Sequence, residues 1–98
     1  MTTPSKIQTG SLIVPTPGTA LPLASVTTPC AKLTISADDN NANPIVVGDA
    51  NVVAAVGASR RGNVILPGGS VAYDIDDLSK VFVDVITSND KVIFSWTS

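Results

Sequence analysis

Short runs of β-branched residues, broken by glycine, proline, aspartate or asparagine, are the feature that most constrains the fold of this chain. Its 98 residues include thirteen Val, eight Ile and ten Thr, whose stiff side chains suit strands better than helices. Every acidic residue is Asp, and strong helix formers are scarce. Turn signals at intervals of about eight to twelve residues separate roughly seven or eight of these runs, which predicts an all-β domain.

Alternation of apolar and polar residues is clearest between residues 29 and 37 and between residues 71 and 76. The same period of two continues at 81–86 and 92–96, and it is typical of half-buried strands. Shorter apolar runs, which also predict strands, occupy residues 45–47, 52–56 and 64–66. Because short turns join the runs, we predict a small antiparallel β-sandwich, jelly-roll-like in form, or a barrel of about seven or eight strands.

The first quarter of the chain differs from the rest by its prolines. We predict that residues 1–24 form a Pro-rich extended arm or edge hairpin and that residues 25–98 form the sandwich domain. Met1 to Ser5 are expected to be a flexible tail or an arm that becomes ordered only on a partner. The arm carries more apolar residues than a solvated tail needs, and four are candidates for binding a partner: Ile7, Leu12, Ile13 and Val14. Two interpretations stay open, namely an arm buried by a partner or neighbouring subunit, and an ordinary edge strand of the same subunit.

The residue inventory argues against catalysis. The chain has no His and no Glu, so the usual general bases and nucleophile partners are missing apart from Asp and Lys. Its single cysteine cannot form an intramolecular disulfide, and no Cys/His cluster predicts zinc, so we expect neither a metal nor another cofactor. A net charge of −2 with six basic residues predicts no nucleic-acid partner, and no apolar run approaches the roughly 18 residues of a membrane span.

Several polar residues are candidates for functional sites. Arg60 and Arg61, in a Gly-flanked loop, are candidates for binding a carboxylate or phosphate of a partner, the alternative being a solvated loop tip. The three aspartates Asp74, Asp76 and Asp77 are interpreted as a solvated face rather than as an acid and base. The polar loop at 38–43 is interpreted as a turn, because it lacks the ligand spacing and the Glu of a calcium loop.

Cys30 and Trp96 have structural interpretations as well. Cys30 is expected to be a small buried hydrophobe, with only Lys32 as a basic neighbour in sequence. Trp96 is either a core residue or an interface anchor. Its two-residue spacing from Phe94 places both rings on one strand face and favours the core.

A series of segments in a fixed order carries a resemblance to a known class of proteins. The segments are Ala20–Leu23, Pro29 with Cys30, the Asp/Asn loop, Ile45–Gly48, Leu66–Gly68, Asp77–Val81 and Val92–Trp96. In order and spacing they resemble small tailed-bacteriophage virion proteins, which include capsid decoration (cement) proteins and the capsid-proximal modules of head fibres. The resemblance spans roughly Gly10 to Trp96. It implies a compact β-sandwich, often a homotrimer, that lies on the capsid surface or carries a fibre, with no catalytic residues.

We therefore expect a non-enzymatic structural virion protein, made in the host cytoplasm, that binds and stabilises the assembled capsid as an oligomer. Its expected partners are the major capsid protein and other virion proteins. The alternative is a head-fibre or tail-associated module that carries, or is, a receptor- or carbohydrate-binding part, and an exposed aromatic platform at Tyr73 or Trp96 would favour it. A small β-type hydrolase is the third possibility, which the absence of His and Glu disfavours.

Overall fold

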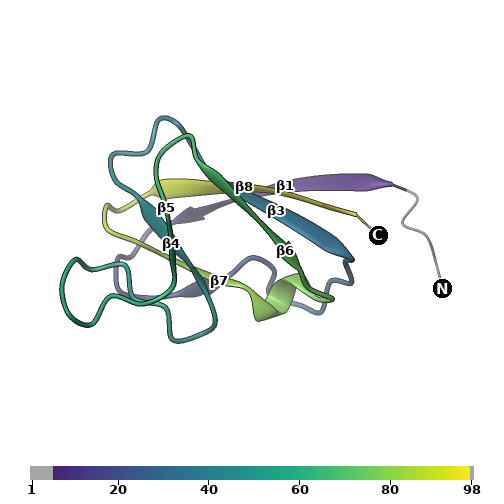
Figure 1. Ribbon diagram of the computed structural model, residues 1–98, viewed down its shortest axis with the longest axis horizontal. Helices are drawn as coiled ribbons and strands as arrows, with labels where there is room; N and C mark the ends of the chain where they lie inside the picture. The colour runs from purple at the N-terminus through teal and green to yellow at the C-terminus, as the bar shows by residue number, and fades with distance from the viewer. Residues whose placement is uncertain (1–5, 98) are drawn as a thin grey trace.

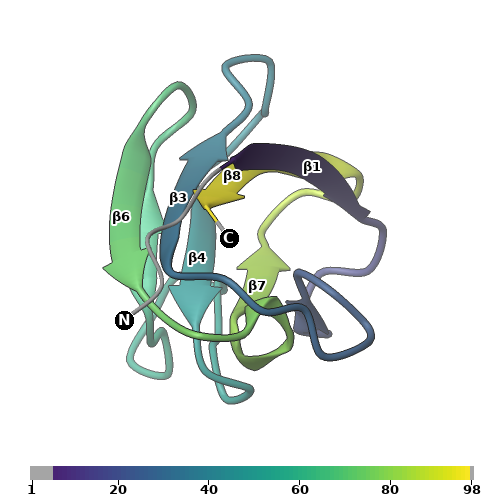
Figure 2. The same cartoon turned by 90° about the vertical axis from the view of Figure 1, so that its right-hand side faces the viewer.

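The computed structural model describes residues 6–97 and shows two four-stranded antiparallel sheets packed as a sandwich (Figures 1 and 2). The predicted all-β sandwich is confirmed, and the two sheets do not join into a barrel. Between residues 6 and 97, no helix is long and apolar enough to cross a membrane. The tail predicted at Met1 to Ser5 lies outside the described residues.

The two sheets are built from eight strands and are accompanied by one short 3-10 turn. The first sheet has the order β1 (Ile7–Val14), β8 (Asp90–Thr97), β3 (Lys32–Ala37) and β6 (Ser70–Asp74). The second has the order β2 (Leu21–Pro22), β7 (Phe82–Val85), β4 (Ile45–Gly48) and β5 (Asn63–Ile65). The 3-10 turn η1 (Leu78–Lys80) leads into β7.

Residues 7–23, interpreted from sequence as an arm or as an edge strand, contribute the edge strands β1 and β2. β1 pairs with β8 over its whole length, from Ile7 opposite Thr97 to Val14 opposite Asp90. Figure 2 shows β1 at the border of the first sheet with β8 beside it. The described part of this segment is therefore integrated into the sandwich.

The core lies between the sheets and follows the predicted period of two. In β3, Leu33 and Ile35 point inward and are fully buried, and Val92 and Phe94 of β8 lie on the same side of the first sheet. The facing side chains of the second sheet include Ile45, Val47, Val83 and Val85. This interior is apolar and rich in branched side chains, which suits close packing between two pleated surfaces.

The strand predicted at residues 52–56 is wrong. This segment makes only an isolated backbone bridge between Val53 and Arg61, inside the long loop of residues 49–62. Val52 and Ala54 are buried against Val46 on the outer side of β4, so the loop covers the second sheet. Val52 and Ala54 of this segment are apolar because they cover the outer face of the second sheet. The backbone of the segment forms its hydrogen bonds outside the strand ladders of both sheets.

Candidate binding surfaces

The four predicted arm residues divide between the two faces of β1. Ile7 and Ile13 face outward and are 75% and 54% exposed. Leu12 packs against the core, and Val14 is fully buried in it. The side chain of Val14 is thus inaccessible to a partner, and the accessible apolar surface of β1 consists of Ile7 and Ile13.

The backbone of β1 also has two sides. The carbonyl of Val14 accepts from Asn89 N–H at 2.9 Å, so Val14 directs its polar groups toward the start of β8. Successive residues of a strand direct them to opposite sides, which turns the N–H and C=O groups of Ile7, Thr9, Ser11 and Ile13 away from β8. Within residues 6–97, these groups form no hydrogen bond with another segment. They constitute an open edge.

A third isoleucine extends the apolar surface of β1 onto β8. Ile93 is 40% exposed and lies opposite Ser11, while Ile13 lies opposite Lys91. Ile93 and Ile13 are therefore diagonal neighbours on the outer face, within reach of each other's branched side chains. Most of the remaining outward positions of β1 and β8 are Thr or Ser.

The structure places Arg60 and Arg61 in different surroundings. Arg61 is exposed, and its backbone pairs with Val53 through bonds of 3.0 and 3.1 Å. Arg60 is half-buried, and its Nε and Nη2 atoms are buried without a hydrogen-bond partner among the described residues. Of the two predicted contact residues, Arg61 is the more accessible to a partner. Val56 in the same loop is 78% exposed.

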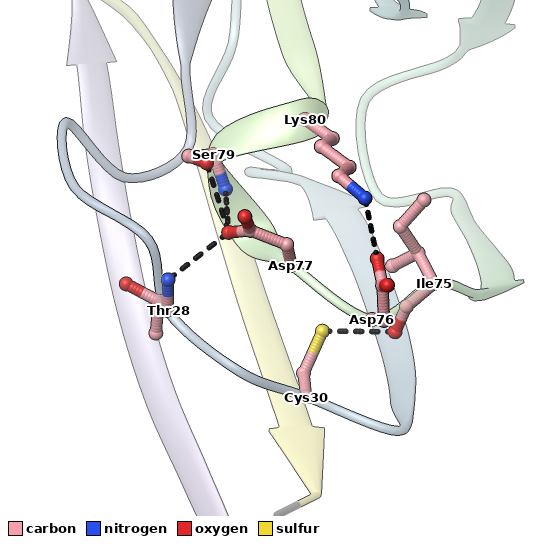
Figure 3. A network of polar contacts seen from close by, with 7 residues as sticks. All are labelled: Thr28, Cys30, Ile75, Asp76, Asp77, Ser79 and Lys80. Carbon is pink, nitrogen blue, oxygen red and sulfur yellow. Dashed lines mark hydrogen bonds and ion pairs between the residues drawn. The ribbon is translucent and has the colours of Figure 1, made fainter.

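The three aspartates near η1 have different roles, and Figure 3 shows two of them, Asp76 and Asp77. Asp74 and Asp76 are exposed and form ion pairs of 3.0 Å with Lys32 and Lys80, respectively. The prediction of a solvated face is confirmed for this pair. Surface pairs of this kind contribute little to stability, because water already solvates both charges.

Asp77 is the N-cap of η1 and ties two segments together. Its carboxylate accepts from Thr28 N–H at 3.0 Å, from Ser79 N–H at 2.9 Å and from the Ser79 hydroxyl at 2.8 Å (Figure 3). The bond from Thr28, followed by those from Ser79, lowers the pKa of this carboxyl below its ordinary value. These contacts give Asp77 a structural role in holding the loop before β3.

Cys30 lies beside the same aspartates. Its thiol donates to the Ile75 carbonyl at 3.0 Å, and the side chain is half-buried (Figure 3). Burial, followed by the negative charges of Asp77 and Asp76, raises the pKa of the thiol. The protonated, unreactive form is favoured.

The two aromatic residues considered as a binding platform are packed against the core. Trp96 stacks on Phe94 with ring centroids 5.6 Å apart, on the shared strand face that was predicted. Tyr73 is half-buried and accepts a hydrogen bond from the Asn63 side chain. A cavity of about 250 Å³ adjoins Tyr73 and is also lined by Gly48, Asp49, Asp74, Ile75, Lys80 and Val81.

The polar loop at residues 38–43 uses its oxygens for internal bonds. Asp38 accepts from Asn40 N–H, and Asn41 exchanges two bonds with the backbone of Lys91. Asp90, buried at the start of β8, accepts from the N–H groups of Ala42 and Asn43. Among the residues that the structure describes, no group of three His, Cys, Asp or Glu side chains is placed to hold a metal.

Sequence reasoning missed most of the exposed apolar positions. Outside β1, the large apolar residues exposed in the described chain are Val26, Val56, Val64, Leu66 and Ile93. Val56, Val64, Leu66 and Ile93 belong to apolar runs, whereas Val26 lies between Ser25 and Thr27. Periodicity alone does not tell which side of a run is covered. The feature that these exposed residues share is proximity to Gly, Pro or an edge strand, where few side chains are available to cover them.

Comparison with known proteins finds no family model, curated protein or solved structure that matches the chain.

Proposed function

We propose that the protein is a non-enzymatic structural protein of a tailed-phage virion, which binds and stabilises the assembled capsid as a decoration, or cement, protein. It would be made in the host cytoplasm and would act at the capsid surface, on the major capsid protein and other virion proteins. The observation that carries the proposal is the set of large apolar side chains exposed on a small sandwich. The resemblance to small virion proteins supplies the class of partner.

The loop of residues 49–62 is the surface best suited to the capsid contact. Its exposed Val56 offers apolar area, and the planar guanidinium of Arg61 can bind a carboxylate through two bonds. The base of the loop is held by the Val53–Arg61 bridge and by a 2.9 Å bond from Ala54 N–H to the buried Asp84. A loop that is already ordered loses little conformational entropy when it binds.

Stabilisation of the capsid would follow from mass action. A protein that binds the assembled lattice and not its dissociated subunits lowers the free energy of the assembled state. Many copies on one particle multiply a modest free energy per site. No chemical step is needed, which agrees with the shortage of general bases in the sequence.

The test uses particles of the phage whose genome encodes this chain, prepared with its gene deleted. Purified protein should sediment with these capsids at a fixed ratio to the major capsid protein and should raise the temperature at which they break open. A protein that stays in the supernatant, or that binds without a change in capsid stability, contradicts the proposal.

Matched variants locate the contact. Val56→Asp with Arg61→Asp should weaken capsid binding by about tenfold or more, the usual effect of losing an anchor residue. Val26→Asp is the control, because Val26 is 68% exposed and lies in the β2–β3 connection, away from this loop in sequence. Equal binding by both variants would remove the loop from the proposed interface.

A receptor- or carbohydrate-binding module of a head fibre or tail is the second candidate, and the cavity beside Tyr73 favours it. Its apolar wall can contact a sugar ring, and Asp49, Asp74 and Lys80 can hydrogen-bond hydroxyl groups. Titration with a panel of monosaccharides, followed by NMR, should shift the amide signals of Tyr73 and Ile75. Spectra that stay unchanged with every sugar would eliminate this cavity as a sugar site.

A further inference from the structure

The outer edge of β1, meaning the border that faces away from β8, is the longest open sheet edge in residues 6–97. β1 has eight residues, whereas the other edge strands β2, β5 and β6 have two, three and five. Neither a charged residue nor a proline lies between Ile7 and Val14. Those residues are the usual means of preventing an edge from pairing, so this edge can accept another strand.

A second copy of β1 is complementary to this edge in one register. If the two strands run antiparallel with Gly10 opposite its own counterpart, Ile7 lies opposite Ile13 of the other copy and Thr9 lies opposite Ser11. All four residues whose backbone groups point outward are then in hydrogen-bonded pairs. Each such pair exchanges two bonds, which gives about eight across the edge.

The side chains select the same register. On the outer face, the exposed Ile7 of one copy would pack beside the exposed Ile13 of the other, twice by symmetry. Ile93 lies diagonal to Ile13 on β8, so each copy would add it to the same apolar strip. A shift of the register by two residues leaves one outward pair unmade at each end and separates Ile7 from Ile13.

We infer that two copies of this chain associate through their β1 strands, in antiparallel pairing centred on Gly10, and so join their first sheets into one eight-stranded sheet. The contact is isologous, with the same surface used by both copies, and therefore closes as a dimer. This inference goes beyond the proposed capsid binding and does not depend on it. The purified chain should dimerise whether or not it binds a capsid.

The test is the solution mass of the full chain, measured by light scattering across a dilution series. The wild type should have twice the 10.0 kDa mass of one chain, with dissociation on dilution. Ile7→Lys with Ile13→Lys places like charges opposite each other at both symmetric pairs and should give a monomer. Ile7→Lys with Ile13→Asp places opposite charges at the same pairs and should retain the dimer.

Controls separate this register from a general effect of added charge. Val56→Lys with Leu66→Lys makes the same change at two exposed residues away from β1 and should leave the mass of the dimer unchanged. Circular dichroism establishes that each variant is folded. In the wild type, hydrogen exchange should be slower at the amides of Ile7, Thr9, Ser11 and Ile13 than in the monomeric variant.

Three results would overturn the inference. They are a wild type that is monomeric at every concentration, a wild type that forms trimers, and a dimer that the two lysine substitutions at Ile7 and Ile13 leave intact. A dimer that behaves as expected but does not bind capsids would refute the capsid function alone.

Discussion

The loops of the second sheet and the outer edge of β1 differ in whether their backbone polar groups have hydrogen-bond partners within the described chain. Around β7, the buried carboxylate of Asp84 accepts from the N–H groups of Gly18, Ala54 and Val85, each at 2.9 Å. Along β1, half of the backbone groups point at the open edge and have no partner in the described chain. The first region satisfies these backbone donors with a side chain of its own, and the second leaves its backbone groups to solvent or to another chain.

The difference indicates where the fold provides partners for its own backbone polar groups and where it does not. A buried backbone donor without an acceptor is costly, so the loops over the second sheet need an internal acceptor, and Asp84 provides one. An exposed edge has no such need, because water serves until another strand replaces it. The predictions below alter one region at a time.

The largest expected effect comes from Asp84→Ala. Asp84 is 1% exposed, and its removal would leave the N–H groups of Gly18 and Ala54 without their acceptor. We expect the free energy of unfolding to fall by about 3 kcal/mol, as measured by urea denaturation. Asp76→Ala, which removes an exposed ion pair, is the control and should leave the curve nearly unchanged.

Asp84→Asn refines this prediction. The Oδ1 atom accepts from Gly18 and Val85, whereas Oδ2 accepts from Ala54. An asparagine that keeps the two bonds of Oδ1 would turn its own N–H₂ group toward the Ala54 N–H, so two donors would meet. The variant should be intermediate between wild type and Asp84→Ala. Wild-type stability in Asp84→Asn would mean that the bond from Ala54 N–H to Asp84, which holds the 49–62 loop, contributes nothing to the free energy of unfolding.

Gly10→Ala should have the next largest effect. Gly10 lies on the inner face of β1, the strand whose edge is open. A Cβ atom at Gly10 would lie 2.9 Å from the Phe94 ring, closer than packed carbon atoms normally approach. Relieving that overlap should cost about 1–2 kcal/mol of unfolding free energy, in thermal or urea denaturation. Ser11→Ala, on the outer face of the same strand, should stay within about 0.5 kcal/mol of wild type. Equal effects of the two substitutions would contradict the two-faced description of β1.

A smaller effect is expected at Asp77, and it depends on pH. Because the folded state lowers the pKa of this carboxyl, its contribution to stability is present above the unfolded value of 3.8 and is lost as the pH falls through the lower folded value. Melting temperatures measured between neutral and acidic pH should therefore fall more steeply for wild type than for Asp77→Asn. Ser79→Ala removes one donor and should give an intermediate slope. A difference between wild type and Asp77→Asn that is constant with pH would contradict this account.

The sequence predicted the strands whose two faces differ, and it failed where a segment is covered by something distant in the chain. The alternation in β3, β6 and β8 is visible because one face of each is packed on the core, whereas β7 is largely buried on both faces. The 52–56 run has the same residue types, but its backbone partner at Ala54 is the Asp84 side chain, thirty residues away. No local pattern encodes that bond.

The candidate surfaces were predictable only in part for a related reason. The apolar excess of β1 was recognisable, but its division into buried Val14 and exposed Ile13 depends on the pairing with β8. Asp84 alternates with Val83 and Val85, which suggests a solvated face, yet it is buried beside Ala54 of the covering loop. Long-range strand pairing decides which of these residues are exposed, and the period of two in the sequence does not reveal that pairing.

The smallest expected effect concerns Cys30, which tests how closed the region near η1 is. The chain has one cysteine, so alkylation by iodoacetamide reports on this thiol alone. Burial and the charges of Asp77 and Asp76 raise its pKa, so the rate in native protein should rise at higher pH than the rate in urea. Restricted access would lower the rate at every pH, whereas a raised pKa moves the profile along the pH axis. Asp76→Asn should move the profile partway back, because burial remains. Native and unfolded profiles with the same midpoint would show that this region is as open to water as the edge of β1.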